Sequence, residues 1–446
     1  MSNVALRKRY KAYSEYKNSG VGWLDEIPSD WVASKVKYLA PFQVGWTPPT
    51  KVDANFLGNN LWANISDLKG KYIERTAKKI SDEAAKVASM EISPKGSLLY
   101  SFKLSVGAVS FASQDMYTNE AIASFLDSGS LPLSFMYYAL PKFVIENAST
   151  NIYGARILNQ ELINSAFLLA PSYNEAEKIT NFLDHETAKI DTLIEKQQQL
   201  IKLLKEKRQA VISHAVTKGL NPDAPMRDSG VEWLENIPKH WDMVPLKYLC
   251  SFSGGGTPSK ENLSYWEGGD IPWVSPKDMK SFWVSKTQDT LTARAVNESS
   301  TNFIEKGALL VVVRSGILQR TIPIAINTVR VTLNQDMKAL QFIKKMDVEY
   351  SANYILGNVP QLLLEWSKDG ATVESIEQEY LSNSIFPVPP IKEQIQINTF
   401  LKSRVSTFQQ LENKVNEEIK LLQERRTALI SAAVTGKIDV RDWQAT

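Results

Sequence analysis

Two copies of one segment pattern make up most of this sequence, and no other feature constrains the fold as strongly. The stretch SGVGWLDEIP (19–28) precedes Trp31, and SGVEWLENIP (229–238), which lies 210 residues later, precedes Trp241. Such self-similarity indicates a duplicated structural unit. Further matches pair Lys37-Tyr38-Leu39 with Lys247-Tyr248-Leu249, Thr47-Pro48 with Thr257-Pro258, Trp62 with Trp273, Gly96 with Gly307, and Lys103 with Arg314.

A second repeated segment lies at the end of each half. IKLLKEKRQAVISHAVT (201–217) corresponds to IKLLQERRTALISAAVT (419–435), at an offset of 218 residues. The chain therefore has the order A-B-A′-B′. Because the offset grows from 210 to 218, the second A segment carries about eight extra residues.

The B segments have the apolar spacing of long α-helices. Between Asn174 and Val216 there is no proline or glycine, and apolar residues recur alternately three and four positions apart. The same spacing from Glu393 to Val434 predicts a second helix with one apolar stripe. A helix of about 40 residues is about 60 Å long and needs a partner over its stripe. We predict that the two helices pack antiparallel as a coiled coil. The residues expected to pack against the other helix or against a partner are Leu183, Ile190, Leu200, Leu204, Leu401, Phe408, Leu422 and Leu429.

Proline and glycine mark the ends of both predicted helices. The first follows Pro171 and the second follows Pro389-Pro390, while Gly219 and Gly436 lie just beyond their ends. Three glutamines at 197–199 interrupt the first stripe. They could act as register markers, as a contact for a third helix, or as a solvated face.

The A segments mix short apolar runs typical of β-strands with turns rich in glycine and proline. Ser97-Leu98-Leu99-Tyr100 and the run from Leu309 to Val313 are examples. The predicted fold class is α+β, with two pseudo-symmetric mixed α/β domains joined by the two long helices. We divide the chain into a first domain with an N-terminal arm, a central helix, a second domain, and a C-terminal helix with a tail, at 1–168, 169–219, 220–387 and 388–446.

Composition excludes several classes of protein. The net charge is only +2, so a nucleic-acid partner would require basic residues gathered on one face. The single cysteine, Cys250, cannot form an intrachain disulfide, and three histidines are too few for a Cys/His zinc cluster. We expect no metal site. We also find no secretory leader and no apolar run that could span a bilayer, so we expect a cytoplasmic protein without membrane contact.

The glycine run Gly254-Gly255-Gly256 lacks the Gly-Lys-Ser/Thr that completes a phosphate-binding loop. Its counterpart, Val44-Gly45-Trp46, is not glycine-rich, so nucleotide binding is disfavoured. We interpret Trp23 and Trp233 as core residues or as contacts between domain and helix. Base stacking is the less favoured alternative, because two readers of different sequences should differ where they touch bases.

The motifs resemble those of the specificity subunits of Type I restriction-modification systems, across essentially the whole chain. SGVGWLDEIPSDW and SGVEWLENIPKHW are similar to the opening of each domain in that family. PPIKEQIQINTFL, which begins at Pro389, and ERRTALISAAVTGKID, which begins at Glu424, resemble the start and end of its conserved helix.

The resemblance implies two target recognition domains, each reading one half of a split double-stranded DNA sequence. It implies that the helices set the gap between the half-sites and that two DNA methyltransferase (M) subunits dock on the chain. Motor-nuclease (R) subunits would be added for cleavage. The first helix departs from the pattern, since Pro171 is followed by Ser172-Tyr173 and not by a second proline. Equivalent contact of the two helix starts with the methyltransferases is therefore in doubt.

Candidate DNA-binding residues follow from charge and from the repeat. Basic positions paired between the copies, such as Lys69 with Lys280 and Lys103 with Arg314, suit phosphate contacts that any sequence shares. Basic and amide residues that differ between the copies suit base readout. The full set is Lys69, Lys71, Arg75, Lys103, Asn151, Arg156, Lys277, Lys280, Arg294, Arg314, Arg320 and Lys368.

We predict no catalytic residue. The only Asn-Pro is Asn221-Pro222, followed by Asp223, which is not the Asn/Asp-Pro-Pro-aromatic motif of adenine methyltransferases. The chain is therefore expected to be the non-catalytic subunit of an adenine-N6 DNA methyltransferase/endonuclease complex, with S-adenosylmethionine, ATP and Mg²⁺ on its partners. The alternatives are a coiled-coil scaffold without sequence-specific DNA binding and, less favoured, a self-contained DNA methyltransferase.

Overall fold

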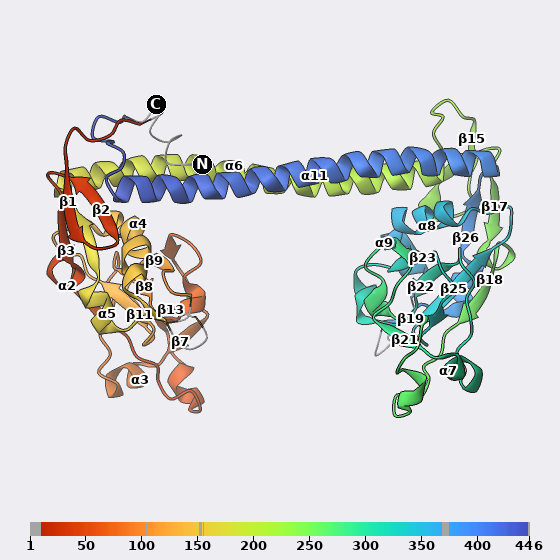
Figure 1. Cartoon of the computed structure of the whole chain (residues 1–446), viewed down its shortest axis with the longest axis horizontal. Helices are drawn as coiled ribbons and strands as arrows, with labels where there is room; N and C mark the ends of the chain where they lie inside the picture. The colour runs from red at the N-terminus through yellow and green to blue at the C-terminus, as the bar shows by residue number, and fades with distance from the viewer. Residues whose placement is uncertain (1–9, 104, 151–153, 155, 368–373, 445–446) are drawn as a thin grey trace. The chain divides into compact units, whose positions relative to one another are not determined.

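The computed structural model describes residues 10–103, 105–150, 154, 156–367 and 374–444. The chain forms two compact units (Figure 1). The first unit comprises Met1–Gln197 and Asn416–Thr446, and the second comprises Gln198–Val415. The division runs through the long helices, so each unit combines one globular part with one end of each helix. The four-segment division from the sequence stays a prediction about separate domains.

A five-stranded sheet forms the centre of the first unit. Its inner strand β8, Leu98–Ser101, is buried at every position, as its short apolar run predicts. Strand β6 pairs parallel with β9, and the other pairings are antiparallel. The sheet order is β4 (Phe42–Val44), β11 (Ile122–Phe125), β8, β9 (Val109–Ala112) and β6 (Tyr72–Ile73).

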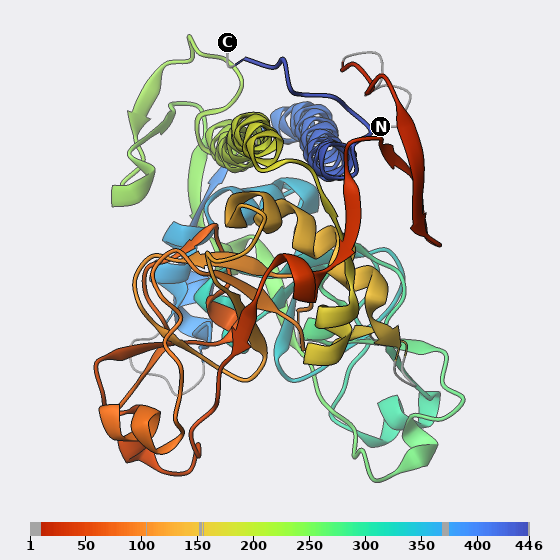
Figure 2. The ribbon, with the colours of Figure 1, turned by 90° about the vertical axis from the view of Figure 1, so that its left-hand side faces the viewer.

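Smaller sheets and short helices surround this sheet. The helix α4, Leu133–Phe143, buries most of its apolar residues in the same core as the sheet. Figure 2 shows α3 at the end of the unit remote from the long helices. The remaining strands are β1 (Tyr16–Val21) with β2 (Leu24–Pro28), β3 (Val32–Lys35) with β14 (Phe167–Ala170), β12 (Ser149–Thr150) with β13 (Arg156–Ile157), and the sheet β10 (Tyr117–Thr118), β5 (Asn60–Ala63), β7 (Lys78–Ile80). The short helices are α2 (Val36–Leu39), α3 (Asp82–Val87), α5 (Gln160–Ser165), η1 (Asp53–Phe56), η2 (Ile65–Asp67) and η3 (Val144–Asn147).

The second unit repeats this plan. Its five-stranded sheet has the order β18 (Cys250–Gly254), β25 (Met337–Phe342), β22 (Leu309–Val312), β23 (Ile324–Asn327) and β20 (Trp283–Val284), and β20 is again the parallel edge strand. The smaller sheets are β21 (Asp289–Leu291), β19 (Ile271–Val274), β24 (Thr332–Leu333); β17 (Asp242–Pro245), β26 (Ile385–Val388); and β15 (Met226–Asp228), β16 (Asn236–Pro238). The short helices are α7 (Ala293–Glu298), α8 (Val348–Gly357), α9 (Val359–Trp366), α10 (Gln378–Asn383), η4 (Glu232–Leu234), η5 (Leu246–Tyr248), η6 (Leu263–Tyr265), η7 (Pro276–Asp278) and η8 (Gly316–Gln319).

The duplication extends to single hydrogen bonds. The indole of Trp62 donates to the carbonyl of Trp46 at 3.0 Å, and the indole of Trp273 donates to the carbonyl of Gly256 at the same distance. The predicted duplication of the A segments is thus confirmed at the level of strand order and of individual contacts.

The glycine run of the second unit has a structural reason. A Cβ on Gly255 would lie 2.0 Å from the carbonyl oxygen of Asn334, and one on the equivalent Gly45 would lie 1.8 Å from that of Thr118. Only glycine permits this close approach of two backbone segments. The position is therefore explained without a phosphate ligand.

The predicted long helices are confirmed. Helix α6 spans Tyr173–Lys218 (46 residues) and α11 spans Ile391–Val434 (44 residues). The glycines that follow them, Gly219 and Gly436, have φ values of +77° and +69°, which is the left-handed conformation that ends many helices.

In each unit, the end of one long helix packs against the end of the other. In the first unit, Arg426 of α11 donates to Asp191 of α6 at 2.8 Å. In the second, Arg208 of α6 lies 3.4 Å from Glu412 of α11.

The predicted packing residues are buried to different degrees. Leu183, Ile190 and Leu429 belong to the core of the first unit, and Leu401 belongs to that of the second. Leu422 is half-buried against the first core, and Leu204 and Phe408 are half-buried. Leu200 is 40% exposed, so its packing against a partner stays a prediction.

The tryptophans of the opening motifs differ in position. Trp31 and Trp241 are buried, and the Trp31 indole donates to Glu175 at 3.0 Å. Trp23 is 41% exposed and lies against Phe143, so its interpretation as a core residue is wrong. The half-buried Trp233 instead donates to Glu365 on α9. Among the described residues, no helix is both long and apolar enough to cross a membrane.

Candidate nucleic-acid interface

Lys103 and Arg314 lie at equivalent places in the two units. Each comes two residues after the central strand of its five-stranded sheet, β8 or β22. The ammonium of Lys103 is 3.9 Å from a carboxylate oxygen of Glu120, and its side chain is 49% exposed. The guanidinium of Arg314 is 3.5 Å from Asp336, and its side chain is 59% exposed. Both cations are therefore accessible and each lies beside one carboxylate.

A Thr-Pro turn lies beside each of these residues and is held in the same way in both units. The amide of Trp46 donates to the carbonyl of Thr118 at 2.9 Å, and the amide of Gly256 donates to that of Leu333 at 2.8 Å. The turn therefore docks on the last residue of β10 or β24.

The side chains presented on this shared frame differ. The hydroxyl of Thr47 donates to Glu120, whereas the hydroxyl of Thr257 bonds the side chain of Gln335. Trp46 is 54% exposed where the second unit has Gly256. The contacts of Thr47 with Glu120 and of Thr257 with Gln335 were not predicted from the sequence. The Thr-Pro dipeptides that match between the copies could have indicated that both turns have the same backbone position. The contact of each threonine with a residue more than 70 positions away has no signal in the local sequence.

Lys69 and Lys280 follow two equivalent short helices, η2 and η7. Both are exposed, and their backbone amides bond the carbonyls of Asp67 and Asp278 at 2.9 and 2.8 Å. The structure thus presents the two lysines on the same turn, as the pairing in the sequence requires. Lys277, within η7, is also exposed.

Lys71 has a different surrounding. Its ammonium donates to Asp184 of α6 at 2.6 Å, and Tyr138 donates to the same carboxylate at 2.5 Å. Lys69 and Lys71 together line a cleft of about 600 Å³ with Asp184 and Arg426. This contact ties the globular part of the first unit to its long helices.

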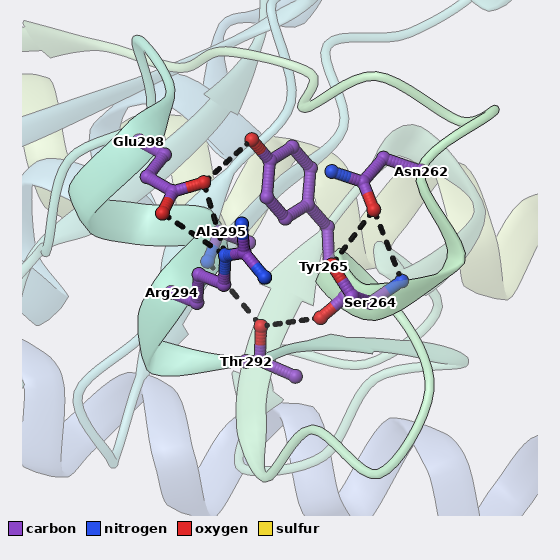
Figure 3. A network of polar contacts seen from close by, with 7 residues as sticks. All are labelled: Asn262, Ser264, Tyr265, Thr292, Arg294, Ala295 and Glu298. Carbon is purple, nitrogen blue, oxygen red and sulfur yellow. Dashed lines mark hydrogen bonds and ion pairs between the residues drawn. The ribbon is translucent and has the colours of Figure 1, made fainter.

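Arg294 belongs to a polar network at the end of the second unit where η6 meets α7 (Figure 3). Its Nε donates to both carboxylate oxygens of Glu298, at 2.9 and 3.1 Å, and Tyr265 donates to Glu298 at 3.0 Å. The hydrogen bond from Arg294, followed by that from Tyr265, lowers the pKa of Glu298. Arg294 is exposed, but its charge is engaged within its own helix.

The other candidates have different surroundings. Arg75 and Arg156 are exposed, and Arg156 donates to the carbonyl of Ile145 at 3.0 Å. Arg320 lines a cleft of about 820 Å³ in the second unit, beside Phe282. Asn151 and Lys368 lie outside the described residues. A role in DNA binding stays a prediction for all twelve residues.

The described residues contain no group of three or more His, Cys, Asp or Glu side chains that could hold a metal ion. The one cysteine, Cys250, is buried, and burial raises the pKa of its thiol to about 12. This thiol is protonated at neutral pH and is a poor nucleophile.

A model of the Type I restriction modification DNA specificity domain matches residues 28–203 and 238–421. The specificity subunit of the Type I restriction enzyme EcoR124I/EcoR124II from Escherichia coli is 40% identical over 184 residues, which are 40% of this chain and 45% of that subunit. The match therefore spans less than half of that relative. The Type I restriction enzyme MjaIX specificity subunit from Methanocaldococcus jannaschii is 23% identical over 97% of this chain and 99% of its own.

Two solved structures have the same fold. A chain from the structural work on complex assembly and conformational transition of the type I R-M system has a TM-score of 0.66 at 15% identity, over 92% of this chain and 99% of its own. The HsdS subunit from Thermoanaerobacter tengcongensis has a TM-score of 0.53 at 15% identity, over 92% of this chain and 98% of its own. At this identity the likeness concerns the fold.

Proposed function

The chain belongs to the family of Type I restriction modification DNA specificity domains, and we propose that it selects the DNA sequence on which a Type I restriction-modification complex acts. The observation that carries this proposal is the pair of family matches in one chain, at 28–203 and 238–421, on two globular parts with one strand order. We call these two globular parts the first and the second reader. Each reader would recognise one half of a split target.

Two readers on one chain give a selectivity that neither has alone. A correct base pair contributes about 1–3 kcal/mol of discrimination, and separated positions add roughly independently. A single reader that contacts a few base pairs would therefore be outcompeted by the many similar sites in a genome. Joining two readers adds their contributions and requires both half-sites.

The Thr-Pro turns are suited to base readout, because the same backbone arrangement presents different hydrogen-bonding side chains in the two readers. With one oxygen bonded by Thr47, the Glu120 carboxylate keeps lone pairs that can accept a hydrogen bond, as from the amino group of cytosine. With its oxygen bonded by Thr257, Gln335 keeps an NH₂ group that can donate to a base edge. Lys103 and Arg314, which carry the same charge in both readers, suit phosphate contacts.

We propose that α6 and α11 pair antiparallel along their lengths and set the gap between the half-sites. The contacts of Arg426 with Asp191 in the first unit and of Arg208 with Glu412 in the second have the antiparallel sense that this pairing requires. The continuity of α6 and α11 through both units gives the chain a stiff element for this purpose.

The long helices also offer a surface for the methyltransferase subunits. Leu193 and Leu421 of the first unit are 46% and 53% exposed. Their repeat counterparts in the second unit, Leu411 and Leu203, are 41% and 60% exposed. Leucine that stays exposed and identical in both copies is suited to a partner helix laid along each helix pair.

The chemistry is proposed to reside on the partners. Two adenine-N6 methyltransferase subunits would bind S-adenosylmethionine, and motor-nuclease subunits would use ATP and Mg²⁺. The target adenine has to leave the duplex to react, so these partners would clamp and distort the DNA around the readers. With a net charge of +2, the chain alone is expected to bind DNA weakly.

A binding titration tests the proposal. The chain, assembled with two methyltransferase subunits, should bind one split sequence far more tightly than others, and the preference should persist as salt rises. Equal affinity for all sequences, lost with salt, would leave only phosphate attraction and favour the scaffold alternative. Methyl transfer by the chain alone with S-adenosylmethionine would contradict a non-catalytic role.

A further inference from the structure

One exposed surface of each reader keeps the same residues in both copies. Lys37 and Tyr38 lie on α2 of the first reader, and Lys247 and Tyr248 lie on η5 of the second. Tyr38 is 70% exposed and Tyr248 is 65% exposed. The lysine ammonium lies over the tyrosine ring in each, 4.7 Å and 5.3 Å from its centre. A tyrosine this exposed has no role in the core that would explain its retention.

A second short helix adjoins this pair in both readers. The amide of Val36 donates to the carbonyl of Ala166, just after α5, at 2.9 Å. The amide of Leu246 donates to Ser384, just after α10, at the same distance. In the second reader, Lys247 also donates to Asn383 of α10 at 2.8 Å.

These adjoining helices begin with the same exposed residues and then diverge. Helix α5 reads QELINS and α10 reads QEYLSN, so the glutamine and glutamate at their start are kept. A glutamate in the first turn stabilises a helix, which explains its retention but not that of the tyrosines. We call the four retained residues the Lys-Tyr patch: Lys37, Tyr38, Gln160 and Glu161 in the first reader, and Lys247, Tyr248, Gln378 and Glu379 in the second.

The charge of the patch favours a protein partner over DNA. Each copy carries one lysine and one glutamate, so its net charge is zero, and a phosphate backbone would be attracted by the first and repelled by the second. Exposed apolar side chains lie nearby on elements in contact with it, with Val32 56% exposed in β3 and Tyr380 47% exposed in α10. Tyrosine at the centre and mixed polar groups around it are typical of protein interfaces.

The repetition of the patch favours a partner that is present in two copies. A patch present once in each unit fits a partner that is present in two copies and meets each reader in the same way. We infer that the Lys-Tyr patch is a second contact for the methyltransferase subunit, in addition to the exposed leucines of the long helices; this rests on the proposed function. A subunit held at both places would be fixed in orientation relative to the reader, as it must be to reach one defined adenine.

The test compares binding of methyltransferase subunits to the full chain and to Tyr38→Ala, Tyr248→Ala and the double variant. Truncating a central interface tyrosine should weaken binding about tenfold at the altered reader. Native mass spectrometry of the single variants should show loss of one methyltransferase copy before the other. The modified DNA motif should be unchanged. Tyr72→Ala, which removes a tyrosine that is 60% exposed but is replaced by Trp283 in the second reader, is the control and should bind normally.

A second variant separates an effect on binding from an effect on folding. Glu161→Lys with Glu379→Lys should weaken subunit binding by more than the small loss of helix stability that thermal unfolding of the chain reports. Unaltered binding in both sets of variants would overturn the inference. So would weaker binding to all DNA sequences with normal subunit binding, because the patch would then contact phosphate. If the unaltered chain bound no methyltransferase subunit at all, both this inference and the proposed function would fail.

Discussion

Lys71 and Asp184 form an ion pair of 2.6 Å that joins the first reader to α6. The repeat places Phe282 at the position of Lys71 and Lys402 at that of Asp184, so the second unit has no such pair there. Phe282 and Lys402 instead line the cleft of about 820 Å³. The two readers therefore share a fold but are attached to the helices by different chemistry.

We expect Asp184→Ala to destabilise the chain more than Lys71→Ala. The side chains of Lys71 and Asp184 are 32% and 39% exposed, so solvent screens the pair and Lys71→Ala should cost about 1 kcal/mol or less. Asp184→Ala also removes the carboxylate that accepts from Tyr138, whose hydroxyl keeps its contact with Thr187 at 3.3 Å, at a further cost of about 1 kcal/mol. Chemical unfolding measures both, with Lys402→Ala as the control that should change little. Equal losses of unfolding free energy for all three variants would contradict an attachment through Lys71 and Asp184 that is specific to the first unit.

Replacing Lys103 or Arg314 with alanine should weaken DNA binding by the assembled complex by a similar factor for every sequence. Loss of one phosphate contact should also reduce the slope of log affinity against log salt by about one. Titrations at several salt concentrations measure this, with Lys207→Ala on α6 as a control that removes the same charge away from the readers. A shift in the preferred sequence would mean that these side chains read bases.

Exchanging the side chains at the Thr-Pro turns should alter one half-site at a time. Glu120→Gln replaces an acceptor with a group that can donate, so the preferred base in the first half-site should change, by about 1–3 kcal/mol of discrimination. The second half-site should stay the same. Gln335→Glu is the reciprocal variant and should change only the second half-site. Sequencing of the modified sites shows which positions move, and an unchanged motif in both variants would exclude these residues from readout.

Lengthening both long helices should lengthen the gap between the half-sites. Seven residues inserted into α6 near Gln197 and into α11 near Asn416 keep the apolar stripes in phase and add about 10 Å. At about 3.4 Å per base pair, this corresponds to about three base pairs. The same seven residues inserted at the exposed turn around Asp223 form the control. A gap that stays the same would show that the helices do not set the spacing.

Much of the fold could be predicted because its signals are local or periodic. The spacing of Leu183, Ile190 and Leu429 determined the helix faces, and the repeat of Trp31 as Trp241 determined that there are two similar units. The heptad pattern does not say whether a residue such as Leu200, which is 40% exposed, packs against the other helix or against a partner.

The candidate site was less predictable, because it depends on contacts between distant residues. Lys71 and Arg294 are basic like the other candidates, yet one bonds Asp184 across 113 positions and the other bonds Glu298 one helical turn away. Composition cannot distinguish a lysine committed to an internal ion pair from one available to DNA. The hydrogen bonds of Thr47 with Glu120 and of Thr257 with Gln335 join residues 73 and 78 positions apart, so only the three-dimensional structure reveals them.

The central claim is that this chain selects a split DNA sequence with its two readers. Sequencing of modified bases in cells that carry the chain with its methyltransferase subunits, and in cells that lack only this chain, tests it most directly. We predict a motif of two defined halves around an unspecified gap, with one modified adenine on each strand, that disappears when the chain is absent. A continuous motif, or a split motif that persists without the chain, would contradict the account.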